Sequence, residues 1–188
     1  MLIVRIYRLE NGVPQNSGIG FFVDANRILS AFHIYGHLDR QNHSTYIAIF
    51  DNLCFPITPI RMNCAKDLVL FQCNGLTCPN NITISATEVN IGDIVCVKSI
   101  EREIITPIFS IIPLITPTIQ FNYTCLLDVN IFCTENPCDQ GMSGSIVLNE
   151  QLEIVGLYSG YANSIDINNG TLFGMCINRN EIVLFLNM

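Results

Sequence analysis

Short β-branched and aromatic segments, each ended by Gly, Pro, Asn or Asp, recur along the whole of this 188-residue chain. Segments of this kind are typical of β-strands, and helical periodicity is weak throughout. About a dozen strands at such spacing favour barrels or sandwiches. The segment 181–188 fits a helix or a strand equally well. We expect strands at residues 2–7, 20–23, 27–31, 46–50, 68–71, 94–97, 104–109, 118–127, 145–148, 154–157 and 172–177.

A polar, turn-rich stretch at 74–92 divides the chain into two parts of similar size. With 49% hydrophobic and 13% charged residues, the composition is that of a globular protein with a substantial core. We therefore predict an N-terminal lobe at 1–75, a connection at 76–92 and a C-terminal lobe at 93–188.

Composition and charge bear on location and partners. The longest apolar runs, such as 108–115, are much shorter than the roughly 20 residues of a membrane helix, so we predict no membrane span. The first residues lack the pattern of a secretory signal, which favours the cytoplasm. A net charge of −7, with nine Lys and Arg in no cluster, argues against nucleic acid as the main partner.

The chain has nine cysteines. An odd number without an export signal predicts a reducing compartment and free thiols. The paired C-x-x-C spacing of zinc ribbons is absent. Cys125, Cys133 and Cys138 form a minor alternative metal site, but we predict no metal and no cofactor.

Three segments carry groups for acyl transfer, in the order His, Asp, Ser. His33 follows a Gly-rich pair of expected strands, Asp67 stands at the mouth of an apolar strand, and Ser143 lies in a turn between Gly141 and Gly144. Each alone fits an ordinary polar residue at a strand end or turn. Together they supply a hydroxyl, a base for its proton and a carboxylate that orients the base.

The residues around these groups resemble chymotrypsin-like serine proteases over about 18–160. The matching motifs are GIGFFVD followed by LSAFH, then DLVL, then GMSGS and IVGLYSG. The resemblance implies an all-β fold of two antiparallel six-stranded β-barrels with the active site in the cleft between them. It also implies an endopeptidase that acts on a polypeptide substrate.

Carried over by motif, the resemblance gives each residue a role. Ser143 is the nucleophile, His33 its base and Asp67 the orienting acid, while the N–H groups of Gly141 and Ser143 form the oxyanion hole. Asp51 is the second candidate for the acid, and Asp39 also lies near His33 in sequence.

Departures from the digestive proteases indicate a branch. Met142 stands where those enzymes carry the Asp of their activation switch, and Ile34 replaces a disulfide cysteine. Together with the short chain, these features resemble the polyprotein-processing proteases of positive-strand RNA viruses, which would place the enzyme in the host cytoplasm. Glutamyl-type or HtrA-like bacterial proteases share several of these features. The sequence leaves open whether the chain forms a homodimer.

The resemblance also implies a specificity pocket with walls at 134–140 and 157–161. No His follows His43, which argues against a His-based pocket for Gln or Glu. Asp139 and Glu135 could favour a basic substrate residue, and Tyr158 or Ser159 could hydrogen-bond a polar one. The predicted substrate-binding residues are Thr134, Cys138, Gln140, Leu157, Tyr158, Ser159 and Gly160.

Two other functions fit the same fold. One is a non-catalytic module that binds peptide or RNA, because barrel scaffolds are often reused. The other is a capsid-like protein that cleaves itself once.

Overall fold

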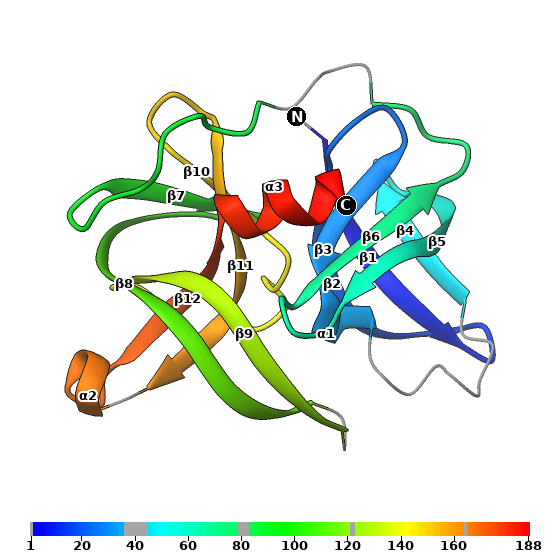
Figure 1. Ribbon diagram of the computed structural model, residues 1–188. Helices are drawn as coiled ribbons and strands as arrows, with labels where there is room; N and C mark the ends of the chain where they lie inside the picture. Colours follow the sequence, from blue (N-terminus) through cyan, green and yellow to red (C-terminus); the bar gives the residue numbers. More distant parts are fainter. Residues whose placement is uncertain (1, 36–44, 79–82, 121–122, 164) are drawn as a thin grey trace.

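Two closed antiparallel barrels lie side by side in the computed structural model (Figure 1). The structure describes residues 2–35, 45–78, 83–120, 123–163 and 165–188. Within these residues the barrels have the strand orders β1-β2-β3-β6-β5-β4 and β10-β11-β12-β9-β8-β7. The predicted all-β fold of two six-stranded barrels is confirmed.

The first barrel buries a continuous apolar core. β3 and β6 pair through Leu29 and Leu70 and are buried over nearly their whole length, and β3 also contacts β11 of the second barrel. Such near-continuous hydrophobic strands are expected where both faces are covered. The six strands are β1 (Ile3–Glu10), β2 (Val13–Phe22), β3 (Arg27–Ala31), β4 (Thr45–Phe50), β5 (Leu53–Asn63) and β6 (Leu68–Cys73).

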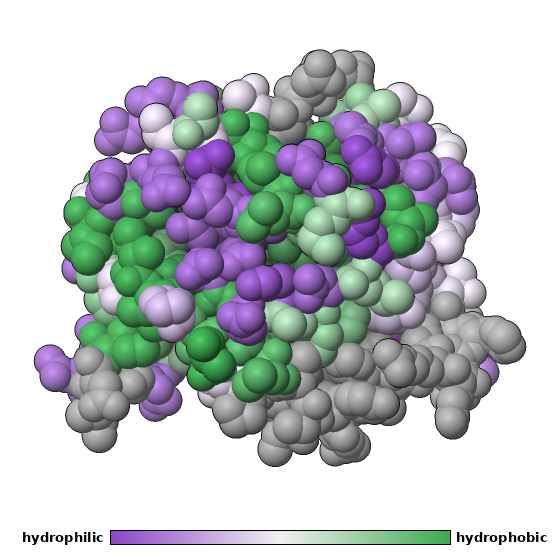
Figure 2. Space-filling view, in the orientation of Figure 1, coloured by the Kyte–Doolittle hydropathy of each residue, from purple (hydrophilic) through white to green (hydrophobic). Residues whose placement is uncertain are grey.

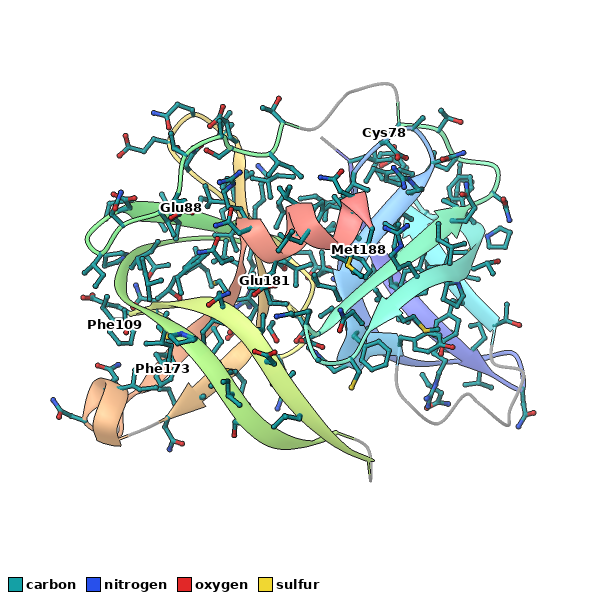
Figure 3. The ribbon with its side chains drawn as sticks, in the orientation of Figure 1. Cys78, Glu88, Phe109, Phe173, Glu181 and Met188 are labelled. Carbon is teal, nitrogen blue, oxygen red and sulfur yellow. The ribbon has the colours of Figure 1, made fainter. Side chains whose placement is uncertain are left out.

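The second barrel contains a long hairpin, β8–β9, which extends beyond the barrel at the bottom of Figure 1. In the second barrel, the rings of Phe109 in β8 and Phe173 in β12 pack edge to face, with their centroids 5.7 Å apart (Figure 3). The strands are β7 (Ile94–Lys98), β8 (Glu103–Gln120), β9 (Tyr123–Thr134), β10 (Ile146–Leu148), β11 (Ile154–Asn163) and β12 (Leu172–Asn178).

Two strand predictions were wrong. The segment 118–127 was expected to be one strand, but β8 ends at Gln120 and β9 begins at Tyr123. β5 was not expected, because Pro56 and Pro59 lower the strand propensity of its sequence. It nevertheless pairs with β4 and β6, with an irregular register between Pro59 and Arg61.

The described residues also form α1 (Phe32–Tyr35), α2 (Ile165–Asn168) and α3 (Arg179–Asn187). α3 resolves the ambiguity of the last segment in favour of a helix, and the Asn178 side chain caps it by accepting from the N–H of Asn180. The helix crosses from the second barrel toward the first (Figure 1). There Arg61 of β5 donates to the carbonyl oxygen of Phe185 at 2.6 Å, so α3 ties the barrels together.

The expectation of free thiols was wrong for Cys64, which is disulfide-bonded. An odd number of cysteines excludes complete pairing but not a single bridge, so the count could not decide this. The side chain of Cys125 lies outside the described part of the chain, and with it the alternative metal site. Within the described residues the free thiols include Cys54, Cys73, Cys96, Cys133, Cys138 and Cys176.

The surface mixes hydrophilic and hydrophobic side chains (Figure 2). Ile94 of β7 and Ile105 of β8 are exposed, and Figure 2 shows hydrophobic side chains along the edge where these strands lie. None of the described helices has both the length and the apolar character needed to cross a membrane.

Candidate active site

His33 lies at the start of α1, directly after the buried strand β3. The backbone fixes this position, because the N–H of Phe32 donates to the carbonyl oxygen of Asp67 at 2.9 Å. The N–H of His33 donates to Oδ1 of Asp67, also at 2.9 Å. Two adjacent residues of α1 are thus bonded to one residue of the turn before β6.

Asp67 holds the His33 ring as well as its backbone. Nδ1 of His33 lies 3.1 Å from Oδ1 and 3.0 Å from Oδ2. An ionised carboxylate only accepts, so Nδ1 carries the proton and Nε2 keeps its lone pair. Asp67 itself is 2% exposed and has a φ of 52°, a conformation that Asp tolerates better than most residues.

The environment of His33 changes its basicity. Burial lowers the pKa of the imidazole, but the charge of Asp67 and its hydrogen bond outweigh this, so the pKa lies above the usual 6.5. The group therefore takes up a proton readily near neutral pH, as a general base must.

Asp51, the second candidate for the acid, has no such contact with His33 in the described part of the chain. Asp51 is exposed in the turn between β4 and β5. Asp39 lies outside the described residues.

Ser143 lies in the turn that precedes β10, and this turn is bonded to both barrels. The carbonyl oxygen of Ser143 accepts from the N–H of Ile19 in β2, which belongs to the first barrel. The N–H of Gly144 donates to the carbonyl oxygen of Tyr158 in β11, which belongs to the second barrel, and both bonds are 2.8 Å long. Gly144 has a φ of 87°, and a Cβ there would lie 1.9 Å from the carbonyl oxygen of Ile19. Only glycine fits this approach of the turn to β2.

Two N–H groups of this turn are available for a ligand. Gly141 has a φ of 86°, and the N–H groups of Gly141 and Ser143 donate to no acceptor in the described part of the chain. Their neighbours are engaged, since the N–H of Met142 donates to Asp139 and that of Ser145 to Met142.

Ser159 of β11 contacts both the turn and the acid. Its carbonyl oxygen accepts from Oγ of Ser143 at 3.0 Å, and its own Oγ donates to Oδ2 of Asp67 at 2.5 Å. One residue thus brings Ser143 and Asp67 to the same place. The sequence pointed to Ser159 only as part of a pocket wall, and no local pattern indicates its contact with Asp67.

The remaining residues expected in the pocket are mostly covered. Thr134 and Leu157 are 0% exposed, Cys138 is 4% exposed, and Gln140 is exposed. The hydroxyl of Tyr158 accepts from the N–H of Cys138 at 2.9 Å, and Gly160 is half-buried.

A polar cavity adjoins the nucleophile turn on the side of β2. Its volume is about 210 Å³, and Ile19, Gln140, Gly141 and Met142 contribute to its lining. Two ion pairs, Arg5–Glu101 and Arg102–Asp139, complete the lining with Ser99. Within the described residues, no three His, Cys, Asp or Glu side chains are arranged to hold a metal ion.

Comparison with solved structures finds the same fold in proteases of known structure. The chain is similar to the Rv3671c protease from M. tuberculosis in its active form, with a TM-score of 0.77 and 19% identity over 98% of this chain and 79% of that one. The inactive form of the same Rv3671c protease gives a TM-score of 0.71, with 18% identity over 98% of this chain and 87% of that one. The serine endoprotease from Yersinia pestis gives a TM-score of 0.66, with 18% identity over 98% of this chain and 61% of that one. No protein-family model and no curated protein sequence matches the chain.

Proposed function

We propose that this chain is a serine endopeptidase that cleaves polypeptides through an acyl-enzyme. One observation carries the proposal: Ser159 joins Ser143 to Asp67, and Asp67 holds the His33 ring by Nδ1. A hydroxyl, a base with a free Nε2 and an orienting carboxylate therefore share one site, as acyl transfer requires.

In this mechanism Ser143 Oγ turns from the carbonyl of Ser159 toward Nε2 of His33 when substrate binds. Rotation about one side-chain bond moves a serine hydroxyl, and catalytic hydrogen bonds commonly tighten only in the substrate complex. His33 takes the proton as Oγ attacks the scissile carbonyl, and it then gives that proton to the leaving amine. Water repeats the sequence on the acyl-enzyme and regenerates Ser143.

The developing oxyanion has two candidate donors, the N–H groups of Gly141 and Ser143. Removal of one such donor typically lowers kcat by about 10²–10³. Asp67 keeps the tautomer of His33 and stabilises the imidazolium that forms.

Among the branches, a bacterial type of serine protease is favoured over a viral processing enzyme. The named structural neighbours are proteases of M. tuberculosis and Yersinia pestis, and they give no support to the viral branch. The substrate proposed is accordingly a polypeptide, without restriction to a polyprotein.

Labelling with a fluorophosphonate probe tests the proposal. We expect the wild type to be labelled at one serine and Ser143→Ala not to be labelled. Ser145→Ala is the matched control, because its hydroxyl is buried two residues away without a hydrogen-bond partner. Absence of labelling in the wild type, together with binding of peptide or RNA that Ser143→Ala leaves unchanged, would favour the non-catalytic module instead.

A further inference from the structure

The Tyr158 side chain extends from one expected wall of the specificity pocket, 157–161, to the other, 134–140, across the space between them. An ideal Cβ on Gly174 of β12 would lie 3.1 Å from Cε2 of Tyr158 and 2.3 Å from Oγ1 of Thr134. The ring therefore lies against β12 and the end of β9. Its hydroxyl reaches the loop 135–138 on the opposite wall, where it meets the backbone of Cys138.

Burial of the wall residues shows how completely this space is filled. Tyr158 is 1% exposed, Thr134 is 0% exposed and Cys138 is 4% exposed. A deep pocket open to substrate would leave the side chains of its walls accessible to water. Tyr158 packs instead in one apolar cluster with Cys138, Met142 and Cys176.

Hydrogen bonds hold the ring in this position. The Tyr158 hydroxyl accepts from the N–H of Cys138 at 2.9 Å and donates to the carbonyl oxygen of the same residue at 3.4 Å. A ring that swung aside would leave these groups of Cys138 without partners in a buried place, which is costly. Burial also raises the pKa of Tyr158, so the hydroxyl stays neutral and able to donate.

The filled space adjoins the point of attack. Tyr158 precedes Ser159, whose carbonyl oxygen lies 3.0 Å from Oγ of Ser143, and the Tyr158 carbonyl accepts from the N–H of Gly144. A substrate carbonyl placed on Ser143 thus has the side chain of its own residue beside Tyr158.

The acids near this place lie exposed at the surface and not in the buried space that Tyr158 occupies. Asp139 is paired with Arg102, and Glu135 is exposed in the loop after β9. The site can therefore select a substrate by the size of the side chain beside Tyr158.

We propose that Tyr158 closes the specificity pocket and restricts the substrate residue on the acyl side of the cut to small side chains, namely Gly, Ala or Ser. This inference rests on the proposed function and adds the substrate class to it. Tyr158 acts here as a specificity-determining residue whose ring occupies the volume that a larger substrate side chain would need.

Peptidyl phosphonates that differ only in the side chain beside phosphorus test the inference. We expect an Ala-like probe to label Ser143 at least about 100-fold faster than a Phe-like probe, since a mismatch of a few methylenes gives discrimination of this order. Comparable rates for the two probes, with fluorophosphonate labelling intact, would overturn the inference and leave the proposed function standing. No labelling by any probe would overturn both.

Three variants separate the ring from its hydroxyl. Tyr158→Ala removes the ring and should raise the rate of the Phe-like probe relative to the Ala-like one at least tenfold. Tyr158→Phe keeps the ring and should keep the preference for Ala, even if the loop is less stable. Ile105→Ala, which removes an exposed apolar side chain of β8 outside both expected walls, is the control and should behave as the wild type. If Tyr158→Ala does not fold, a loss of the preference in Tyr158→Phe, which keeps the ring, would still contradict the inference.

Discussion

Ser159 Oγ donates to Oδ2 of Asp67 at 2.5 Å, and the two residues come from different barrels, 92 positions apart. His33, which shares the Asp67 carboxylate, comes from the same barrel as Asp67. The orientation of the acid therefore depends on how the two barrels are seated against each other. Hydrogen bonds to a charged group are stronger than neutral ones, so this contact contributes substantially to that orientation.

Substitution of Ser159 should therefore weaken catalysis without abolishing it. For Ser159→Ala we expect kcat/KM to fall only about tenfold, because the bonds from His33 to Asp67 remain. This factor corresponds to a loss of about 1.4 kcal/mol of transition-state stabilisation. Ser159→Thr keeps a hydroxyl and should restore most of the activity. Equal loss in both variants, with equal stability, would contradict a role for the hydroxyl.

Asp67→Asn should have a much larger effect on the rate. The amide can hold the wrong tautomer of His33 by donating to Nδ1, and comparable changes in serine proteases lower kcat by about 10⁴. Asn tolerates the positive φ of this position as Asp does, so the fold should persist. The check is kcat with a peptide substrate alongside thermal unfolding. A decrease of less than about tenfold would reassign the orienting acid.

The pH dependence of activity follows from the raised pKa of His33. The base must be neutral to accept the proton of Ser143, so kcat/KM should fall as the pH drops through a value above 6.5. The effect on stability has the opposite sign. A folded-state pKa above the unfolded value stabilises the protein below pH 6.5, and this stabilisation is lost as the pH rises through the folded pKa. An acid limb of kcat/KM centred below 6.5 would contradict the contact between His33 and Asp67.

The sequence allowed the fold of two β-barrels to be predicted, because short strands bounded by turn residues recur along the chain. The roles of His33, Asp67 and Ser143, each of which lies in a local motif at a strand end, stay a prediction. β5 escaped prediction because Pro56 and Pro59 obscure a strand that pairs on both edges. The β8–β9 reversal escaped because no Gly or Pro interrupts the segment 118–127. The contacts of Ser159 with Asp67 and of Tyr158 with Cys138 join distant segments, and no local pattern encodes them.

Gly144→Ala should prevent stable folding of the nucleophile turn. A Cβ there would lie 1.9 Å from the carbonyl oxygen of Ile19 and 2.6 Å from Oγ of Ser30, which itself bonds that carbonyl. Backbone strain at positive φ and overpacking together should cost about 3 kcal/mol or more. Gly160→Ala is the control, because no atom lies within 4 Å of its ideal Cβ. Chemical denaturation gives the midpoint of unfolding of each variant. Similar midpoints for Gly144→Ala and Gly160→Ala would show that the turn can move away from β2.

Glu181 should be the polar residue of α3 whose loss destabilises the protein most clearly. Its carboxylate is buried, accepts from the N–H of Asn130 at 2.9 Å and from Nδ2 of the same residue at 2.8 Å, and pairs with Lys66 at 3.3 Å. Figure 3 shows Glu181 on the side of α3 that lies toward β9. Since Lys66 precedes Asp67, this contact also steadies the turn that carries the acid.

Glu181→Ala would remove the carboxylate that accepts both hydrogen bonds of Asn130, and hydrogen bonds to a charged group typically contribute about 1.5–3 kcal/mol. We therefore expect the free energy of unfolding to fall by about that amount in urea, with kcat reduced as the Lys66 turn loosens. Glu88→Ala is the matched control, because Glu88 is exposed and, among the described residues, accepts a single hydrogen bond, from Asn180 of the same helix at 2.7 Å. Its effect should stay within about 0.5 kcal/mol. Equal shifts of the two midpoints would mean that α3 is held by its apolar residues Ile182 and Phe185 rather than by the buried carboxylate.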